Sequence, residues 1–264
     1  MVVVMTIAGY DPSAGAGTLA DIKTMSAFGC YGVAAVTSLT FQNTQGVFGA
    51  AHQAREVVAE QIRALLDDFD IAAVKTGMLP TAGVIEEVAA RIATARLPHL
   101  VVDPVARSTS GYDLIDQEAL AVLIEQLFPL ASVVTPNRAE AERIAGVAIS
   151  GADDMKKAAA TILSFGAKAV VIKGGDLAGE TASDLLMDEG GATIYAEPRV
   201  PSTHTHGTGC TLSSALACLL GQGHSLREAL PLAKRYIALA IRQAPGLGKG
   251  HGPLNHFPPE FGLQ

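Results

Sequence analysis

The sequence has no tryptophan and only three cysteines, Cys30, Cys210 and Cys218. Three cysteines are too few, and odd in number, for the disulfide framework of a secreted domain, and the last two would lie about 12 Å apart along one helix. No apolar run approaches the roughly 18 residues of a membrane-spanning helix. The N-terminus lacks the basic start and long apolar segment of a signal peptide. We therefore expect a cytoplasmic protein that does not bind membranes.

Positive charge is also scarce. The 264 residues include 19 Lys and Arg against 26 Asp and Glu, which gives a net charge of −7 with no run of basic residues. This balance argues against nucleic acid and anionic lipid as partners. With 49% hydrophobic residues the chain can bury a large core, and we expect a single domain over residues 1–264.

Several catalytic motifs are absent as well. The sequence has no P-loop of the form G-x-x-x-x-G-K-[ST] and no G-x-S-x-G hydrolase motif. Residues 15–20 match the dinucleotide-binding pattern G-x-G-x-x-G/A. Six residues separate them from the first expected strand, however, and no acidic residue ends the second expected strand, so we do not expect a dinucleotide site. His204, His206 and Cys210 lack a standard zinc spacing and a fourth ligand.

What the chain does contain is a regular alternation of short β-branched runs and amphipathic segments, which predicts an α/β fold with a mainly parallel sheet and helices on both faces. The expected strands are 2–8, 32–39, 71–75, 100–103, 132–135 and 169–173, followed by a small β-hairpin of 183–187 and 193–197. The expected helices are 18–28, 55–69, 81–96, 117–127, 153–165, 211–220 and 225–243, and a further one begins near residue 137.

The segment of residues 205–214 predicts a phosphate cradle, because two glycines lead directly into an alanine-rich helix. Free N–H groups and the positive end of the helix dipole attract anions there, and glycine lets a phosphate approach. The expected donors are Thr208, Gly209, Cys210 and Thr211. The Cys210 thiol should have a lowered pKa at this position. A tight turn with a buried, inert cysteine would explain the same residues.

Polar side chains follow several expected strands, at the sheet edge where ligands bind in open α/β folds. Asp103, Asn137 and Glu140 offer the hard oxygens that a magnesium–nucleotide site requires, although Glu140 would also suit helix capping. Lys173, followed by two glycines, is a candidate phosphate ligand.

Other residues at this edge suit an organic acceptor. Gln42 is expected in a polar loop of residues 40–46. Its amide could form hydrogen bonds with the edge of a heterocycle, although an amide exposed to solvent in a turn is the commoner explanation for such a residue. Met78 and Val105 could wall a flat ring or simply pack in the core. The small, polar segment 107–112 suits a mobile flap.

These motifs, in this order, resemble the ribokinase-fold kinases and, within them, the hydroxymethylpyrimidine/phosphomethylpyrimidine kinases of thiamine biosynthesis. The similarity runs nearly end to end. The stretches that carry it are residues 8–13, 15–17, 20–24, 42–44, 75–78, 103–105, 135–137 with 140, 173–175, 205–211 and 250–253.

The resemblance implies two ATP- and Mg²⁺-dependent steps at one site: phosphorylation of 4-amino-5-hydroxymethyl-2-methylpyrimidine, then of its monophosphate to the diphosphate. It also implies a homodimer. By position, the pyrimidine would be bound by Gln42, Gly9, Asp21, Met78 and Val105. The magnesium ligands would be Asp103 and Glu140, and the nucleotide phosphates would lie against Asn137, Lys173, Thr208, Gly209 and Thr211. The catalytic group would comprise Cys210, Lys173, Gly207 and Gly209.

Cys210 stands where the wider fold has an aspartate base. It could act as a base, in which case it should matter more for the first step, or it could contribute mainly its backbone N–H. Tyr10, Phe41 and Ala106 depart from the family pattern of serine, alanine and methionine, which leaves pyridoxal kinase as the alternative activity. A non-catalytic pyrimidine-binding regulatory module is a second alternative, but it would not need Lys173, Glu140 and Cys210 together.

Overall fold

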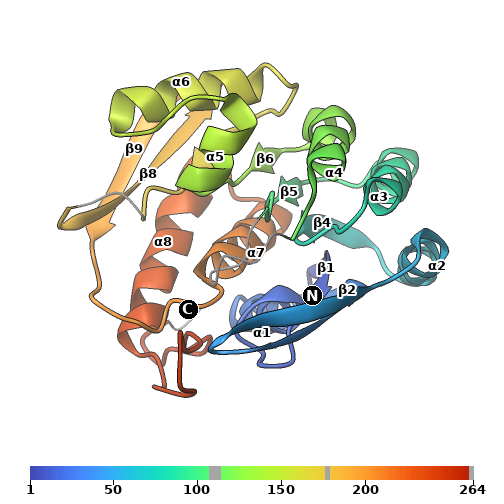
Figure 1. Cartoon of the computed structure of the whole chain (residues 1–264), viewed down its shortest axis with the longest axis horizontal. Helices are drawn as coiled ribbons and strands as arrows, with labels where there is room; N and C mark the ends of the chain where they lie inside the picture. The colour runs from blue at the N-terminus through green and yellow to red at the C-terminus, as the bar shows by residue number, and fades with distance from the viewer. Residues whose placement is uncertain (107–113, 176–178, 262–264) are drawn as a thin grey trace.

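The strands form one mixed sheet with a parallel centre (Figure 1). The computed structural model describes residues 1–106, 114–175 and 179–261. Within these residues nine strands follow the order β3-β2-β1-β4-β5-β6-β7-β8-β9. The six central strands run parallel: β2 (Tyr31–Asn43), β1 (Val3–Tyr10), β4 (Ile71–Thr76), β5 (Leu100–Val102), β6 (Val133–Val134) and β7 (Val170–Ile172).

The two edges of the sheet are antiparallel. On one side β3 (Gly46–His52) pairs with β2, and on the other β8 (Thr181–Asp188) and β9 (Gly191–Pro198) form the predicted hairpin. The predicted α/β fold, with a parallel centre and a hairpin after the last parallel strand, is therefore confirmed.

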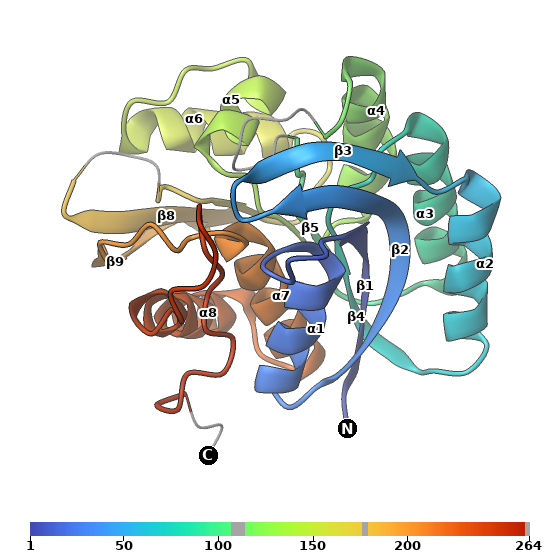
Figure 2. The ribbon, with the colours of Figure 1, turned by 60° about the horizontal axis from the view of Figure 1, so that its bottom comes forward.

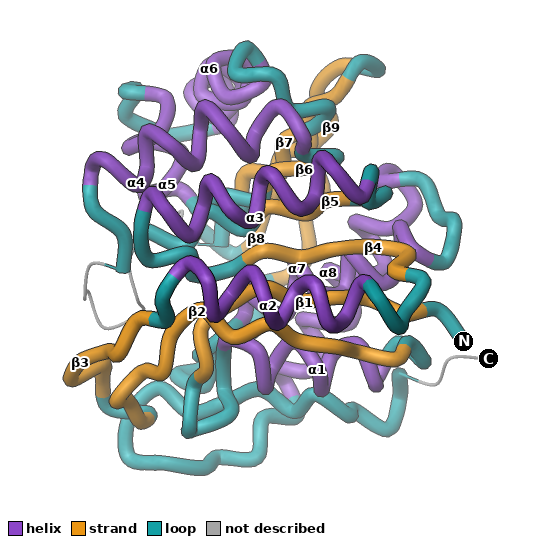
Figure 3. Tube along the Cα trace, turned by 90° about the vertical axis from the view of Figure 1, so that its right-hand side faces the viewer, coloured by secondary structure: helices purple, strands orange, loops and turns teal. Residues whose placement is uncertain are grey.

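Helices cover both faces of the sheet, as the alternation predicts (Figure 3). One face carries α2 (Arg55–Leu66), α3 (Ala82–Ala95), α4 (Gln117–Val122) with the π-helical turn Leu123–Leu127 and the 3₁₀ turn Phe128–Leu130, α5 (Arg138–Ala145) and α6 (Ala152–Leu163). The other face carries α1 (Gly17–Ala27), α7 (Thr208–Gly221) and α8 (Leu226–Arg242).

The central strands are apolar on both sides because each side packs in a separate core. In β5, Leu100 and Val102 join the cluster under α2 to α6, whereas Val101 joins the cluster under α7 and α8. Neighbouring residues of a strand point to opposite faces, so a strand buried on both faces reads as a continuous apolar run. None of the described helices is both long and apolar enough to cross a membrane.

The prediction for residues 40–46 is wrong. The strand β2 continues to Asn43, and Gln42 lies within it instead of in a loop. The strand β3 was not predicted, because its sequence Gly46–His52 contains two glycines and two alanines and lacks a clear apolar alternation. The curved hairpin of β2 and β3 is visible in Figure 2. The proposed flap of residues 107–112 lies outside the described part of the chain.

Candidate active site

A buried ion pair joins two strand ends beneath the start of α7. Lys173, directly after β7, places its Nζ 2.9 Å from Oδ1 of Asp103, which directly follows β5. The two side chains are 14% and 3% exposed. A Cβ added to Gly209 would lie 3.0 Å from Nζ of Lys173. The structure thus brings together a cation, a carboxylate and the backbone of the predicted cradle.

The cradle depends on a close contact between two glycine loops. Gly207 has a φ of 82°, in the left-handed region, and serves as the N-cap of α7. A Cβ on Gly207 would lie 1.9 Å from the carbonyl oxygen of Gly15. Only glycine fits there, both in conformation and in space.

Three backbone N–H groups at this turn have no acceptor within the described residues: those of Gly207, Gly209 and Cys210. The other two expected donors are already bonded. Thr208 donates to the oxygen of Thr205 at 3.3 Å, and Thr211 donates to that of Gly207 at 2.9 Å. Predicting backbone donation from Thr208 and Thr211 was therefore wrong, since the N–H of Thr211 already closes the first helical turn. The Thr211 hydroxyl faces His256 at 3.4 Å.

The Cys210 thiol is partly buried in the first turn of α7. Burial, together with the charges of Asp103 and Asp21, raises the pKa of this thiol to about 11, although the nearby Lys75 opposes the shift. The predicted lowering of the Cys210 pKa is therefore wrong. Neighbouring carboxylates and desolvation outweigh the helix terminus.

Asp21 and Lys75 form a fully buried ion pair below Cys210. Nζ of Lys75 lies 2.8 Å and 3.0 Å from the two carboxylate oxygens of Asp21, which also accept hydrogen bonds from the hydroxyls of Thr6 at 2.6 Å and Ser214 at 2.7 Å. The Asp21 side chain has no exposed surface. The Asp21 carboxylate supports the cradle from beneath through its bond to Ser214 in α7, and its contact with the pyrimidine stays a prediction.

Glu140 and Asn137 form a capping box at the start of α5. The amide oxygen of Asn137 accepts from the Glu140 N–H at 2.9 Å, and Glu140 accepts from the Asn137 N–H at 2.8 Å. Burial, with Asp103 nearby, raises the pKa of Glu140 to about 7, although Lys173 opposes this shift. The capping explanation of Glu140 is thus correct. The charges of Lys173 and Asp103 also affect the pKa of its carboxylate.

Asp103 and Glu140 are compatible with magnesium but do not form a complete cage. No group of three or more His, Cys, Asp or Glu side chains in the described residues could hold a metal ion. Magnesium is usually held by one or two carboxylates together with substrate phosphates and water. Two buried carboxylates at the edge of a phosphate cradle fit that pattern.

The residues expected around the acceptor lie on neighbouring strand ends. Gly9 approaches Met78 so closely that a Cβ would lie 3.1 Å from its sulfur. Met78 is held by the Thr37 hydroxyl, which donates to its carbonyl oxygen at 2.6 Å. Val105 is half-buried two residues beyond Asp103. Gln42 is half-buried near the end of β2.

The sequence analysis missed Asp11 and His206. The Nε2 atom of His206 lies 2.9 Å from Oδ2 of Asp11 and joins the loop before α1 to the loop before α7. Burial would raise the pKa of Asp11, but its hydrogen bonds with His206 and Ser13 lower it to about 2. The Asp-Pro-Ser sequence indicates a turn, but nothing in it signals a partner 195 residues away.

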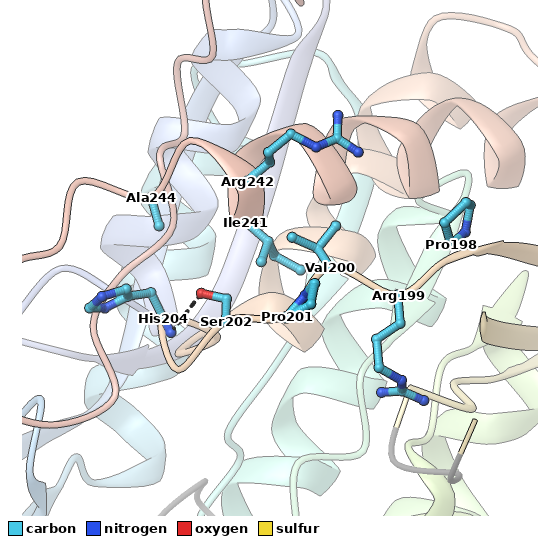
Figure 4. A pocket seen from close by; sticks show the side chains of 9 residues that line it. All are labelled: Pro198, Arg199, Val200, Pro201, Ser202, His204, Ile241, Arg242 and Ala244. Carbon is cyan, nitrogen blue, oxygen red and sulfur yellow. Dashed lines mark hydrogen bonds between the residues drawn. The ribbon is translucent and has the colours of Figure 1, made fainter. Parts of the chain in front are cut away.

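Two cavities flank these residues. One of about 400 Å³ lies between the segment before the cradle and the end of α8; its walls include Val200, His204 and Ile241 (Figure 4). Another of about 680 Å³ includes Asn137 and Glu140 in its wall. Open space therefore lies beside Asn137 and Glu140, and a separate cavity lies along the segment that leads to the cradle.

Comparison with known proteins identifies the family. Residues 11–255 match the family model described as phosphomethylpyrimidine kinase. The chain belongs to this family. The resemblance drawn from the sequence is confirmed.

Individual relatives are similar over almost the whole chain. The hydroxymethylpyrimidine/phosphomethylpyrimidine kinase of Streptomyces coelicolor is 44% identical over 96% of this chain and 93% of its own length. The thiamine biosynthesis bifunctional protein ThiED of Geobacter sulfurreducens is 47% identical over 96% of this chain, which spans 52% of that longer protein. The crystal structure of Bacillus subtilis pyridoxal kinase with ADP is 35% identical, with a TM-score of 0.91 over 99% of this chain and 100% of that one.

Proposed function

We propose that the protein phosphorylates 4-amino-5-hydroxymethyl-2-methylpyrimidine with ATP and Mg²⁺, and then phosphorylates the monophosphate to the diphosphate. The observation that carries the proposal is the meeting of three unpaired cradle N–H groups with Lys173 and Asp103. Phosphoryl transfer depends mainly on positioning and on stabilising developing charge, and this arrangement supplies both.

The phosphates of ATP would lie against the N–H groups of Gly207, Gly209 and Cys210, with the Lys173 ammonium beside them. Asp103 and Glu140 would hold Mg²⁺, which when bound neutralises charge on the phosphates. The backbone N–H of Asn137, which donates to the Glu140 carboxylate, keeps that carboxylate at the edge of the site.

The nucleoside of ATP would occupy the cavity beside the cradle. Figure 4 shows the apolar side chains of Val200, Pro201 and Ile241 gathered in it, with Arg199 and Arg242 at its margin. His204 lines the same cavity three residues before Gly207. A cavity with apolar side chains and several polar groups, lined by the segment that leads to the cradle, suits a nucleoside.

The acceptor would lie over Gly9 and Met78 and near Val105. The amide of Gln42 would form hydrogen bonds with the edge of its ring. The lack of a Cβ on Gly9 lets Met78 approach β1. Because the Cys210 thiol keeps its proton at neutral pH, we propose that Cys210 contributes mainly its backbone N–H to the cradle and that its thiol is not the base.

Pyridoxal kinase is the alternative activity, favoured by the similarity to the Bacillus subtilis enzyme and by the aromatic Tyr10 and Phe41. A non-catalytic binding module is disfavoured by the Lys173–Asp103 pair at the cradle. Homodimerisation stays a prediction from the family resemblance, and a cytoplasmic location stays a prediction from the sequence.

The test of the transfer site is Lys173→Met, assayed by ADP release with hydroxymethylpyrimidine. We expect kcat/KM for ATP to fall about 100-fold, because the phosphates lose a point charge. Lys168→Met is the matched control, since Lys168 is an exposed lysine just before the same strand β7. Equal loss in both variants, or loss in neither, would contradict the site.

A further inference from the structure

The C-terminal segment of residues 247–253 runs between the acceptor side and the phosphate side of the site. At one end it reaches the turn between β2 and β3, where its red trace meets the tip of the blue hairpin in Figure 2. At the other end it pairs with the residues that lead into α7. The segment therefore connects two parts of the site that are far apart in the sequence.

The contact with the hairpin is made by one hydroxyl group. Thr44 is half-buried in the turn directly after β2, two residues beyond Gln42. Its Oγ1 atom accepts the backbone N–H of Lys249 at 3.1 Å and that of Gly250 at 3.3 Å. The approach is close, because a Cβ on Gly250 would lie 2.2 Å from the carbonyl oxygen of Thr44. A side chain without an oxygen at position 44 would take this acceptor away from both N–H groups.

The other end of the segment holds the residue that precedes the cradle. The N–H of His206 donates to the carbonyl oxygen of Gly252 at 3.2 Å, and His206 also forms an isolated β-bridge with Pro253. The imidazole of His206 is bound separately, by the Asp11 carboxylate at 2.9 Å. Because Gly207 directly follows His206, these contacts help to fix the direction of the free Gly207 N–H.

The segment also supports the wall of the nucleoside cavity. His204 lines that cavity, and a Cβ on Gly252 would lie 2.2 Å from Nδ1 of His204. This nitrogen is buried and has no hydrogen-bond partner within the described residues. Packing against Gly252 therefore holds this side of the His204 ring in place. His251 adds a hydrogen bond from its Nδ1 to the carbonyl oxygen of Thr203 at 3.1 Å.

We propose that Thr44 is a positioning residue for nucleotide binding, and that it acts through the C-terminal segment on His204 and on the phosphate cradle. Thr44 belongs to the hairpin that carries Gln42, yet its hydroxyl stabilises the nucleotide side of the site. The inference rests on the proposed function, in which ATP occupies the cradle and the cavity beside it. Loss of the hydroxyl should weaken nucleotide binding even when no acceptor is present.

The experiment measures the Kd of the non-hydrolysable analogue AMP-PCP with Mg²⁺ by calorimetry, using the purified full chain without acceptor. Thr44→Val keeps the shape of the side chain and loses the hydroxyl, whereas Thr44→Ser keeps the hydroxyl and loses the methyl group. We expect the Kd of Thr44→Val to rise about tenfold, because two N–H groups of the segment lose their acceptor. Thr44→Ser should bind within about twofold of the wild type.

Thr161→Val is the matched control for the substitution itself. The Thr161 hydroxyl donates to the carbonyl oxygen of Lys157 on the exposed side of α6, and its loss should leave the Kd unchanged. Equal binding by the wild type and Thr44→Val would overturn the proposal. Equal weakening in Thr44→Val and Thr44→Ser would also overturn it, because the hydroxyl would then not be the group responsible.

A second variant covers the case in which Thr44→Val does not fold. Gly250→Ala should push the segment away from the turn, because of the 2.2 Å approach to Thr44, and should raise the Kd at least about tenfold. Gly83→Ala is its control, since the nearest neighbour of the new Cβ would be Arg55 at 3.9 Å. Unchanged binding by Gly250→Ala would overturn the proposal. Absence of AMP-PCP binding by the wild type would instead contradict the proposed function, and the inference with it.

Discussion

At the scale of single residues, the protonation of Cys210 separates two mechanisms. A free cysteine thiol has a pKa near 8.5, whereas burial and two carboxylates raise the pKa of Cys210 to about 11. The thiolate fraction at pH 7.5 should then be about 100-fold or more below that of a free thiol. We expect alkylation of Cys210 by iodoacetamide, followed by mass spectrometry, to be slow at pH 7.5 and to accelerate up to about pH 11.

The same residue predicts the outcome of Cys210→Ala. Because the alanine variant keeps the backbone N–H, we expect each of the two phosphorylation steps to slow by less than about tenfold. A general base typically contributes at least about 100-fold. A loss of that size confined to the first step would show that the thiol is a base.

Gly209 tests the geometry of the cradle directly. A Cβ there would stand 3.0 Å from Nζ of Lys173, so Gly209→Ala should displace the ammonium and narrow the phosphate site. We expect kcat/KM for ATP to fall about 100-fold with unfolding stability kept, since alanine suits a helix. Gly175→Ala is the control, because its Cβ would meet nothing within 4 Å. Full activity of Gly209→Ala would contradict the placement of the phosphates.

At the scale of elements, a third buried ion pair ties α8 to β8, the strand that pairs with β7. Nζ of Lys234 lies 2.6 Å from Asp184, whose other oxygen accepts the N–H of Gly174 at 3.0 Å. The two charged side chains are 7% and 8% exposed. The ion pair thus supports the turn that immediately follows Lys173.

Breaking this pair should destabilise the protein. We expect Lys234→Met to lower the free energy of unfolding by about 3 kcal/mol, because it leaves a buried, unpaired carboxylate. The double variant Lys234→Met/Asp184→Asn should recover at least half, since no charge is left unpaired. Urea denaturation measures the free energy of unfolding of both variants. The exposed pair of Lys156 and Asp153 is the control, and Lys156→Met should lower the free energy of unfolding by less than about 0.5 kcal/mol. An equal loss at both lysines would contradict the account.

Elements were predictable where hydrophobic periodicity is strong. The helix expected at residues 81–96 is observed at Ala82–Ala95, and the strand expected at 71–75 at Ile71–Thr76. The strand β3 was missed because its exposed, glycine-rich residues carry no pattern of burial. Edge strands are stabilised by pairing with a neighbour, which local sequence does not reveal.

At the scale of the whole molecule, the site is built from contacts that no local pattern encodes. Lys173 could be predicted as a phosphate ligand, yet its pairing with Asp103 joins residues 70 positions apart. The bond between Asp11 and His206 joins residues 195 positions apart. Asp21 becomes buried only because α1 packs on α7. Motifs identify which residues carry the chemistry, and packing decides which of them face the ligand.

The protein, as proposed here, phosphorylates both the pyrimidine and its monophosphate. The most direct measurement is a coupled ATP-consumption assay with Mg²⁺, in which the purified protein is offered hydroxymethylpyrimidine, its monophosphate and pyridoxal in parallel. The account predicts turnover of both pyrimidines, with the monophosphate converted to the diphosphate. Turnover of pyridoxal alone, or of none of the three, would contradict it.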